Sequence, residues 1–364
     1  MSQSSKKNRI IFIDLMRAFA VLMMVQGHTV DVLLSPSHRT MDSPFFAIWL
    51  FMRGMTAPIF MFTAGTVFTY LFRLTDEPFR TNPRVKKGIK RFLLLVGLGY
   101  LLRYPTASLF DFSVVSDQSW HVFIQVDVLH LIGFGVLFLV ISAYIAEKTS
   151  LPDYIVFGLM GSSFFILYPF VTNLNWAGIL PPVLAGYFYY GTGSLFPLFP
   201  WIGYVICGGV LGSYLAKNPL VFKTSKFSRT LAIWGMIFII LFFIINLIEK
   251  EFYNDPNLYD SYYGIICLRV GFVLMLNGLI SFLSIKIDTI PRIIILIGRN
   301  TLLIYVVHLM ILYGSAWNPG LIAAFGQSFG VVNTVGTAMI MITLMVSMVA
   351  LIHKLKLKTK ELVT

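Results

Sequence analysis

The chain has 364 residues, of which 57% are apolar and only 12% are charged. Soluble domains are about 45–50% apolar and about 25% charged. This composition, with a mean hydropathy of +0.80, therefore excludes a soluble globule, a disordered chain and a coiled coil. Many apolar stretches reach the ~20 residues that a helix needs to cross a bilayer. We expect an all-α protein, a polytopic helical bundle embedded in the lipid bilayer.

The formal net charge of +12 comes from 28 Lys and Arg against 16 Asp and Glu. In a membrane protein we attribute this excess to basic residues kept on the cytoplasmic side during insertion, not to nucleic-acid binding. Two cysteines, Cys207 and Cys267, make neither a disulfide framework nor a metal site. The basic N-terminus leads into an apolar run without a small-residue cleavage site, so we expect a retained first span.

Hydropathy and turn residues predict about ten transmembrane helices in one domain, residues 1–364. Their approximate ranges are 10–33, 45–72, 92–110, 122–146, 154–172, 200–216, 230–248, 262–284, 291–313 and 331–353. If residues 1–9 are cytoplasmic, the inside segments hold 21 Lys and Arg and the outside loops hold two, Arg39 and Lys250. The positive-inside rule then predicts that both termini, including the basic tail 354–364, are cytoplasmic.

The longest outside connection, about 173–199, has no charged residue and is rich in Pro, Gly and aromatic residues. Two interpretations are open. The segment folds back into the membrane surface or caps a cavity, or it forms an interfacial aromatic belt. No internal repeat is visible, which disfavours a transporter built from duplicated halves.

The first span carries a polar stripe. Arg17 and His28 are eleven residues apart, about three helical turns, so they face the same way. Asp14 lies about one turn before Arg17, and Asp31 about one turn after His28. Ionisable groups at membrane depth are costly, so each is a candidate functional residue. The alternative for Asp14 and Arg17 is a simple ion pair within the helix.

Other spans add basic and titratable groups, and these residues are Arg53, Arg103, His130, Arg269, Arg299 and His308. Together they predict a polar cavity that threads the bundle. Its cytoplasmic tier, with Asp14, Arg17 and Arg299, would receive an anionic ligand. Its outer tier would carry histidines, which are natural general bases near neutral pH.

Structural alternatives exist for these groups. A histidine inside a bundle often only hydrogen-bonds a neighbouring helix, and Arg53 could satisfy carbonyls freed by Pro58. Arg103 could snorkel or cap a helix. The basic cluster 80–91 is interpreted chiefly as a topology and headgroup signal, with contact to nucleotide phosphates as the lesser alternative.

The pattern R-x10-H, Arg17 to His28 within DLMRAFAVLMMVQGH, resembles the opening helix of polytopic membrane acyltransferases. MRGMTAPIFMFTAG (52–65) resembles the second-helix P-x-F-x-F-x-x-G signature of that superfamily. DVLHLIGFG (127–135) and FPLFPWIGYVICGGVLG (196–212) resemble the heparan-α-glucosaminide N-acetyltransferase catalytic-domain family. GRNTLLIYVVHLMIL (298–312) resembles a late helix shared with the membrane sugar O-acyltransferases. The matches run from residue 9 to about 312.

The resemblance implies an acyltransferase that moves an acyl group, expected to be acetyl, from cytoplasmic acyl-CoA to a sugar hydroxyl or amine at the outer face. By it, His28 matches the catalytic histidine and Arg17 its partner. Two departures stand out. An Arg-x-x-Arg pair before the third span is here Gly88 and Arg91, and the lysosomal N-acetyltransferase places its active histidine in the first luminal loop, so His38 stays a candidate.

The predicted mechanism assigns a role to each group. Arg17, Arg91 and Arg299 bind the phosphates of the acyl-CoA donor. His28 acts as base or as acyl-carrying nucleophile, and Asp31 orients its imidazole. Arg53 or His130 stabilises the oxyanion. The groups expected at the substrate are Asp14, Arg53, Arg103, His130 and His308.

No metal is expected, because the histidines lack metal-motif spacing. The rival hypothesis is a non-enzymatic transporter or exporter of an anionic glycan or lipid precursor that uses the same basic cavity. A passive structural membrane protein would leave the deep basic groups without a role. Acyl-CoA binding separates the enzyme from the transporter.

Overall fold

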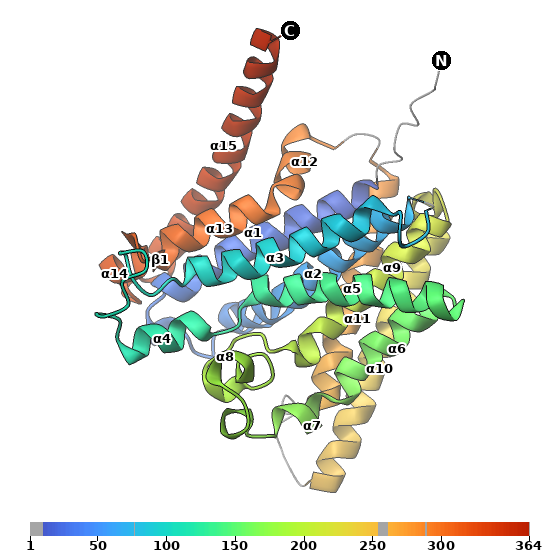
Figure 1. Ribbon diagram of the computed structural model, residues 1–364, viewed down its shortest axis with the longest axis horizontal. Helices are drawn as coiled ribbons and strands as arrows, with labels where there is room; N and C mark the ends of the chain where they lie inside the picture. The colour runs from blue at the N-terminus through green and yellow to red at the C-terminus, as the bar shows by residue number, and fades with distance from the viewer. Residues whose placement is uncertain (1–9, 76, 254–260, 288–289, 364) are drawn as a thin grey trace.

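The computed structural model describes residues 10–75, 77–253, 261–287 and 290–363. The predicted cytoplasmic segment 1–9 and the last residue of the predicted tail lie outside the described residues. The described chain is helical apart from loops and one two-residue antiparallel strand pair, which confirms the all-α prediction. The elements (Figure 1) are α1 (Ile11–Leu33), α2 (Pro44–Arg73), α3 (Pro83–Leu102), α4 (Asp117–Ile124), α5 (Val128–Thr149), α6 (Asp153–Ile166), α7 (Tyr168–Thr172), α8 (Pro182–Ala185), α9 (Leu198–Lys217), α10 (Ser225–Tyr253), α11 (Tyr262–Ile285), α12 (Arg292–Arg299), α13 (Thr301–Leu312), β1 (Gly314–Ser315), β2 (Asn318–Pro319), α14 (Leu321–Phe325) and α15 (Val331–Val363).

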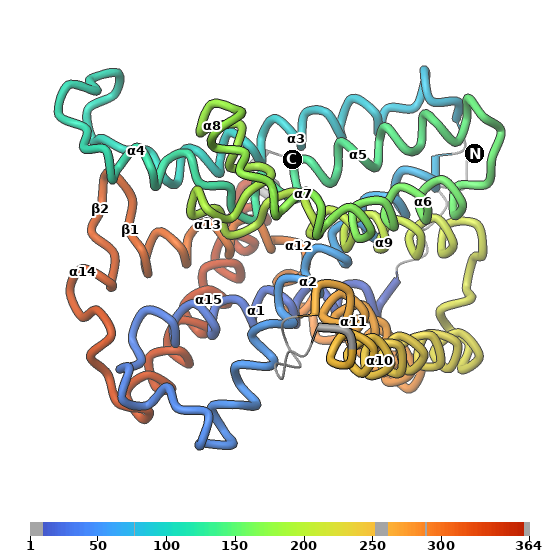
Figure 2. The backbone as a smooth tube through the Cα atoms, turned by 90° about the horizontal axis from the view of Figure 1, so that it is seen from below, coloured from blue at the N-terminus to red at the C-terminus, as the bar shows by residue number. Residues whose placement is uncertain are grey.

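Helices α1, α2, α3, α5 and α13 run in a similar direction across Figure 1. Helix α3 packs along α5, and Figure 2 shows these two at one edge of the molecule, while α1 packs against α2 and α13. At one end of this group lie α4, α14 and the β1–β2 pair, and at the other end lie the start of α3 and the end of α5 (Figure 1). Helix α10 packs along α11 beside them. The arrangement brings α1 and α13, which are far apart in sequence, side by side.

Glycines allow α9 to lie against the backbone of α2. A Cβ added at Gly208 would collide with the carbonyl oxygen of Phe62, and one at Gly212 would collide with that of Thr66. From the other side, a Cβ at Gly65 would strike the carbonyl oxygen of Val205. Small residues at a helix interface permit this close approach in membranes, where van der Waals packing drives association.

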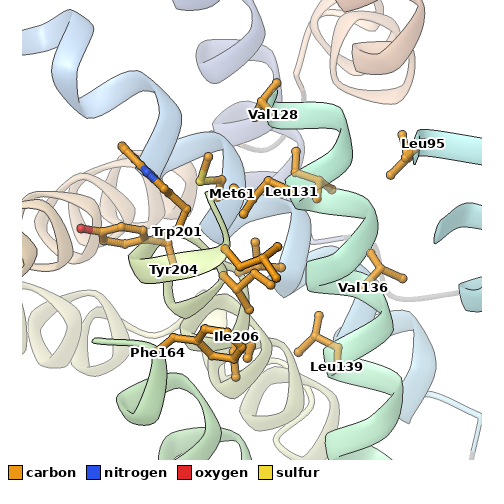
Figure 3. Packing of buried hydrophobic residues seen from close by; sticks show 14 of the residues in the cluster. Met61, Leu95, Val128, Leu131, Val136, Leu139, Phe164, Trp201, Tyr204 and Ile206 are labelled. Carbon is orange, nitrogen blue, oxygen red and sulfur yellow. The ribbon is translucent and has the colours of Figure 1, made fainter. Parts of the chain in front are cut away.

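The largest apolar cluster joins α2, α3, α5, α6 and α9. Figure 3 shows Met61, Leu131, Phe164, Tyr204 and Ile206 gathered in it. Interdigitated side chains of this kind have few voids and deform little. The cluster therefore holds α3 and α5 at fixed positions relative to α2.

Seven described helices are long and apolar enough to cross a membrane, and an eighth span results if α12 and α13 count as one. The predicted span 92–110 falls on α3, which begins earlier and ends at Leu102, and the predicted span 154–172 is divided between α6 and α7. The predicted span 291–313 is bent by 74° between α12 and α13. The bend lies at Asn300, where φ and ψ leave the helical region.

The segment 173–199 folds back onto the start of α5. The amide of Val126 donates to Ser194 Oγ over 3.0 Å, and the amides of Leu195 and Phe196 donate to the carbonyl oxygen of Val126 over 3.0 and 3.2 Å. The side chains of Leu195 and Phe196 line a cavity. This confirms the cavity-capping interpretation of the segment.

Tyr187 anchors the same segment inside the protein. Its side chain is buried, and its hydroxyl lies 2.9 Å from that of Tyr100 on α3. Burial, and then the neighbouring hydroxyl of Tyr100, raise the pKa of Tyr187 above its ordinary value. The phenol therefore stays neutral and remains available as a hydrogen-bonding group.

Candidate active site

The helices α1, α2, α3, α5 and α13 enclose two cavities. The Arg17 cavity has a volume of about 480 Å³, and the His28 cavity has a volume of about 590 Å³. Tyr305, which is 3% exposed, is the one described residue that lines both of them. Its ring stacks on Phe60 with the ring centroids 6.4 Å apart. The single cavity predicted from the sequence is thus two cavities that meet at an aromatic side chain.

Basic side chains line the Arg17 cavity, and its described lining contains no carboxylate. The basic residues are Arg17, Arg84, Lys87, Lys90 and Arg91. Most of the remaining wall is apolar. A charged group beside an apolar, low-dielectric wall attracts an opposite charge more strongly than the same group does in bulk water. The cavity therefore suits a polyanion that also carries an apolar portion.

The start of α3 supplies four of these basic side chains, and hydrogen bonds of Asn82 hold this part of the helix in position. The side chain of Asn82 caps the helix by accepting from the amide of Arg84 over 2.9 Å, and it donates to the carbonyl oxygen of Phe72 over 3.3 Å. Across the cavity, a guanidinium nitrogen of Arg17 lies 3.5 Å from Thr301 Oγ1 on α13. Four residues of the cluster 80–91 therefore line a cavity, and their contact with nucleotide phosphates stays a prediction.

The His28 cavity is lined by groups of both signs. Four residues singled out from the sequence line it, namely His28, Asp31, Arg53 and Arg103. Polar and aromatic residues that sequence reasoning missed complete its wall, among them Tyr104, Gln118, Gln125, Asp127, Tyr313 and Ser315. Such a lining can hold a polar ligand through several directional hydrogen bonds.

Asp31 pairs with an arginine and forms no hydrogen bond to the imidazole of His28. The carboxylate accepts from Arg53 Nε over 2.7 Å. This pairing joins the end of α1 to α2. We expected Asp31 to orient the histidine, and the structure instead gives it a guanidinium partner.

Arg39 stabilises the end of α1. Its guanidinium donates to the carbonyl oxygens of Val30, Asp31 and Leu34 over 2.8 to 3.3 Å. The carbonyl oxygen of Val30 also accepts from the amide of Leu34. The last carbonyls of a helix are short of partners within it, and a cation is favourable at the negative end of the helix dipole. The turn that carries His28 and Asp31 is therefore held by a residue that the sequence placed in an outside loop.

His130 lies behind the cavity wall. It is fully buried and lines neither cavity, but its Nδ1 lies 2.9 Å from Asp127 Oδ1. Asp127 also caps α5 by accepting from the amides of Leu129 and His130, and its other oxygen lies 3.9 Å from Arg103 Nε. The contact with the cavity that we expected of His130 is thus made by Asp127.

His308 is also fully buried, and it packs against His28. The two rings meet edge to face with their centroids 5.4 Å apart. Tyr305 flanks His308 at 5.5 Å, and Tyr313 flanks His28 at 5.7 Å. The ring of His308 is therefore a neighbour of the candidate catalytic histidine and does not itself line the cavity.

Three further candidates, Asp14, Arg299 and His38, line neither cavity. Asp14 sits where α12 crosses α1, because a Cβ at Gly298 would lie 2.7 Å from its carbonyl oxygen. Arg299 is exposed, and His38 is exposed in the short 3-10 turn after α1. Among the described residues, no group of three or more His, Cys, Asp or Glu side chains is placed to hold a metal ion.

The residue that sequence reasoning missed most clearly is Tyr305. It lies four residues after Thr301 and three before His308, so the three side chains share one face of α13. That spacing was the available signal. Without knowledge that α13 packs against α1, an aromatic residue in an apolar helix is indistinguishable from ordinary packing.

These observations define a polytopic helical membrane protein with two polar cavities that meet inside the bundle. Over residues 9–247 the chain matches the family described as heparan-alpha-glucosaminide N-acetyltransferase, catalytic. The chain belongs to this family, and its general activity is that of a membrane acetyltransferase. No curated protein and no solved structure matches it.

Proposed function

We propose that this protein transfers an acetyl group from acetyl-CoA in the Arg17 cavity to a sugar amine or hydroxyl in the His28 cavity. One observation carries the proposal: a basic cavity without carboxylates and a cavity that presents a histidine meet at one side chain, Tyr305. A donor with an anionic head and a reactive end can occupy one side and react on the other.

The Arg17 cavity supports a donor that carries phosphates. Arginine binds phosphate oxygens through paired hydrogen bonds, and lysine does so as a point charge. Arg17, Arg84 and Arg91 provide the first kind of group, and Lys87 and Lys90 the second. The apolar wall suits the pantetheine arm, whose thioester would extend toward Tyr305. The positive-inside pattern puts this cavity on the cytoplasmic side.

The proposed chemistry uses the imidazole of His28 as general base. The imidazole takes the proton of the acceptor amine or hydroxyl as the nitrogen or oxygen bonds to the thioester carbonyl carbon. Arg53, held by Asp31, stabilises the charge that develops on the carbonyl oxygen. The carbon–sulfur bond then breaks, and the leaving thiolate takes the proton from the imidazolium. The products are the acetylated sugar and CoA with a free thiol.

The His28 cavity supports a sugar as the acceptor. The carboxylates of Asp31 and Asp127 can accept from sugar hydroxyls or from an ammonium group, and Tyr104 and Tyr313 offer aromatic faces to a sugar ring. The family is described as acting on a glucosaminide nitrogen, which favours an amine over a hydroxyl. Basic-residue asymmetry puts this cavity at the outer face.

The test uses purified protein in lipid nanodiscs with acetyl-CoA labelled in the acetyl group and glucosamine oligosaccharides as acceptors. We expect release of free CoA thiol together with labelled sugar. In His28→Ala, turnover should fall by about 100- to 10,000-fold, while acetyl-CoA binding measured by calorimetry is kept. Protein that neither binds nor hydrolyses acetyl-CoA would refute the proposal and favour a transporter of an anionic precursor.

A further inference from the structure

Arg269 is the one charged residue of α11. Although it was among the groups expected in a polar cavity, it lines neither the Arg17 cavity nor the His28 cavity. Among the described residues no carboxylate forms an ion pair with its guanidinium, and its Nε is buried without a hydrogen-bond partner. A charge at membrane depth without an ionic partner is costly, so the side chain that it does contact is informative.

The guanidinium lies over the indole of Trp201 on α9. Its central carbon is 4.9 Å from the centroid of the Trp201 ring, and Trp201 is buried. The face of an aromatic ring is negative, so a cation is attracted to the face rather than to the edge, and indole attracts it best. The attraction strengthens where water is excluded. Arg269 therefore favours an orientation of the indole in which a face is turned toward α11.

The same indole contacts the segment 173–199, which caps the His28 cavity. Trp201 Nε1 donates to the hydroxyl oxygen of Tyr190 over 2.8 Å. The indole also packs edge to face on the ring of Phe196, with the centroids 4.9 Å apart and an interplanar angle of 76°. Phe196 lines the His28 cavity. One indole thus connects a cation on α11 to the wall of that cavity.

We propose that Arg269 is a positioning residue. Acting through Trp201, it holds the ring of Phe196 in the wall of the cavity that takes the acceptor. The amide of Phe196 donates to the carbonyl oxygen of Val126, which fixes the backbone, and the packed indole then fixes the ring. An apolar side chain at position 269 would cost less in the membrane, but it would not select a face of the indole. This inference rests on the proposed function, because that function puts the acceptor in the His28 cavity.

The test compares Arg269→Met with Arg269→Lys in nanodiscs, with acetyl-CoA and glucosamine oligosaccharides as substrates. Methionine keeps an unbranched side chain without the charge, whereas lysine keeps a cation that the indole face attracts. We expect Arg269→Met to raise the KM for the acceptor roughly 3- to 30-fold, the range of one cation–π contact, and to lower kcat by less. The KM for acetyl-CoA should stay within a factor of about two of wild type, because the Arg17 cavity is intact. Arg269→Lys should restore most of the wild-type acceptor KM. Lys250→Met, which removes an exposed cation from α10, should change neither KM.

A double-mutant cycle separates positioning from a general loss of packing. Phe196→Leu should raise the acceptor KM by itself, and adding Arg269→Met should raise it little further, since both changes act on the same ring. Thermal melting in detergent establishes first that each variant folds, and Arg269→Gln replaces a methionine variant that does not. A wild-type acceptor KM in the folded variant, an equal rise in both KM values, or independent effects of the two changes would overturn the role of Arg269 and leave the proposed function standing. Wild-type protein that transfers no acetyl group would refute the proposed function, and this inference with it.

Discussion

Arg17 combines two environments that a single charged residue seldom meets. It lies in the apolar helix α1, where a charge is costly, and it lines a cavity with four other basic side chains. One of its guanidinium nitrogens lies 3.5 Å from the neutral hydroxyl oxygen of Thr301. The basic side chains of this cavity repel one another, and no carboxylate in its described lining offsets the repulsion. An anion that enters the cavity would stabilise them, so Arg17 is suited to ligand binding.

Arg17→Ala should raise the KM for acetyl-CoA more than it lowers kcat. A hydrogen bond to a charged group contributes about 1.5–3 kcal/mol, which corresponds to roughly 10- to 100-fold in affinity. Steady-state kinetics measures both constants. Arg292→Ala, which removes an exposed arginine that lines neither cavity, is the matched control. Loss of kcat at an unchanged KM would contradict a donor-binding role.

At the scale of elements, α13 carries the connection between the two cavities. Thr301 meets Arg17 at one level of this helix, and His308 meets His28 at another. Tyr305 lies between these levels and stacks on Phe60 of α2. The stacked pair is the partition that the donor's reactive end has to pass.

Tyr305→Trp should block transfer while acetyl-CoA still binds. The larger indole fills the junction, whereas the phosphate-binding side chains lie elsewhere in the Arg17 cavity. Product formation and calorimetric binding are measured on the same preparation. Tyr305→Phe, which keeps the ring and its stacking, should retain transfer. If the tryptophan variant turns over at the wild-type rate, the passage does not run past this residue.

The contact between α2 and α9 depends on residues without a Cβ. Gly208→Ala places a methyl group against the carbonyl of Phe62, and overpacking of this kind costs about 1–3 kcal/mol. We expect a lower melting temperature in detergent. Gly97→Ala on α3 is the control, because its Cβ would meet open space, and it should melt at or above the wild-type temperature. Equal melting of both variants would show that the interface relaxes without cost.

At the scale of the whole molecule, the group formed by α1, α2, α3, α5 and α13 has two ends that differ in charge. The basic start of α3 lies at one end, and the turn after α1 lies at the other (Figure 1). If basic residues stay inside during insertion, donor and acceptor enter from opposite sides of the membrane. The proposed reaction would then move an acetyl group across the bilayer without moving CoA.

This orientation is tested by cysteine labelling in intact cells, after Cys207 and Cys267 are replaced by serine. Ser37→Cys, in the exposed turn after α1, should react with a membrane-impermeant maleimide. Thr81→Cys, exposed just before α3, should react only after the membrane is permeabilised. The reverse pattern would invert the proposed sides of both substrates.

Composition and periodicity alone determined that the chain is an all-α membrane bundle and that Arg17 and His28 share a face of the first helix. These properties follow from helix geometry, which repeats locally and is written in the spacing of residues. Helix spacing predicted Arg17, His28 and Asp31 as cavity residues, the cost of a charge at membrane depth predicted Arg53 and Arg103, and the family resemblance predicted Arg91.

Only the tertiary structure determined which of these side chains contact one another. It paired Asp31 with Arg53, placed His308 behind His28, set Asp127 in front of His130 and divided the cavity at Tyr305. These contacts depend on which helix faces lie together, and that choice is made by glycine interfaces and core packing between residues far apart in sequence. Apolar helices resemble one another too closely for spacing within a single helix to reveal its neighbour.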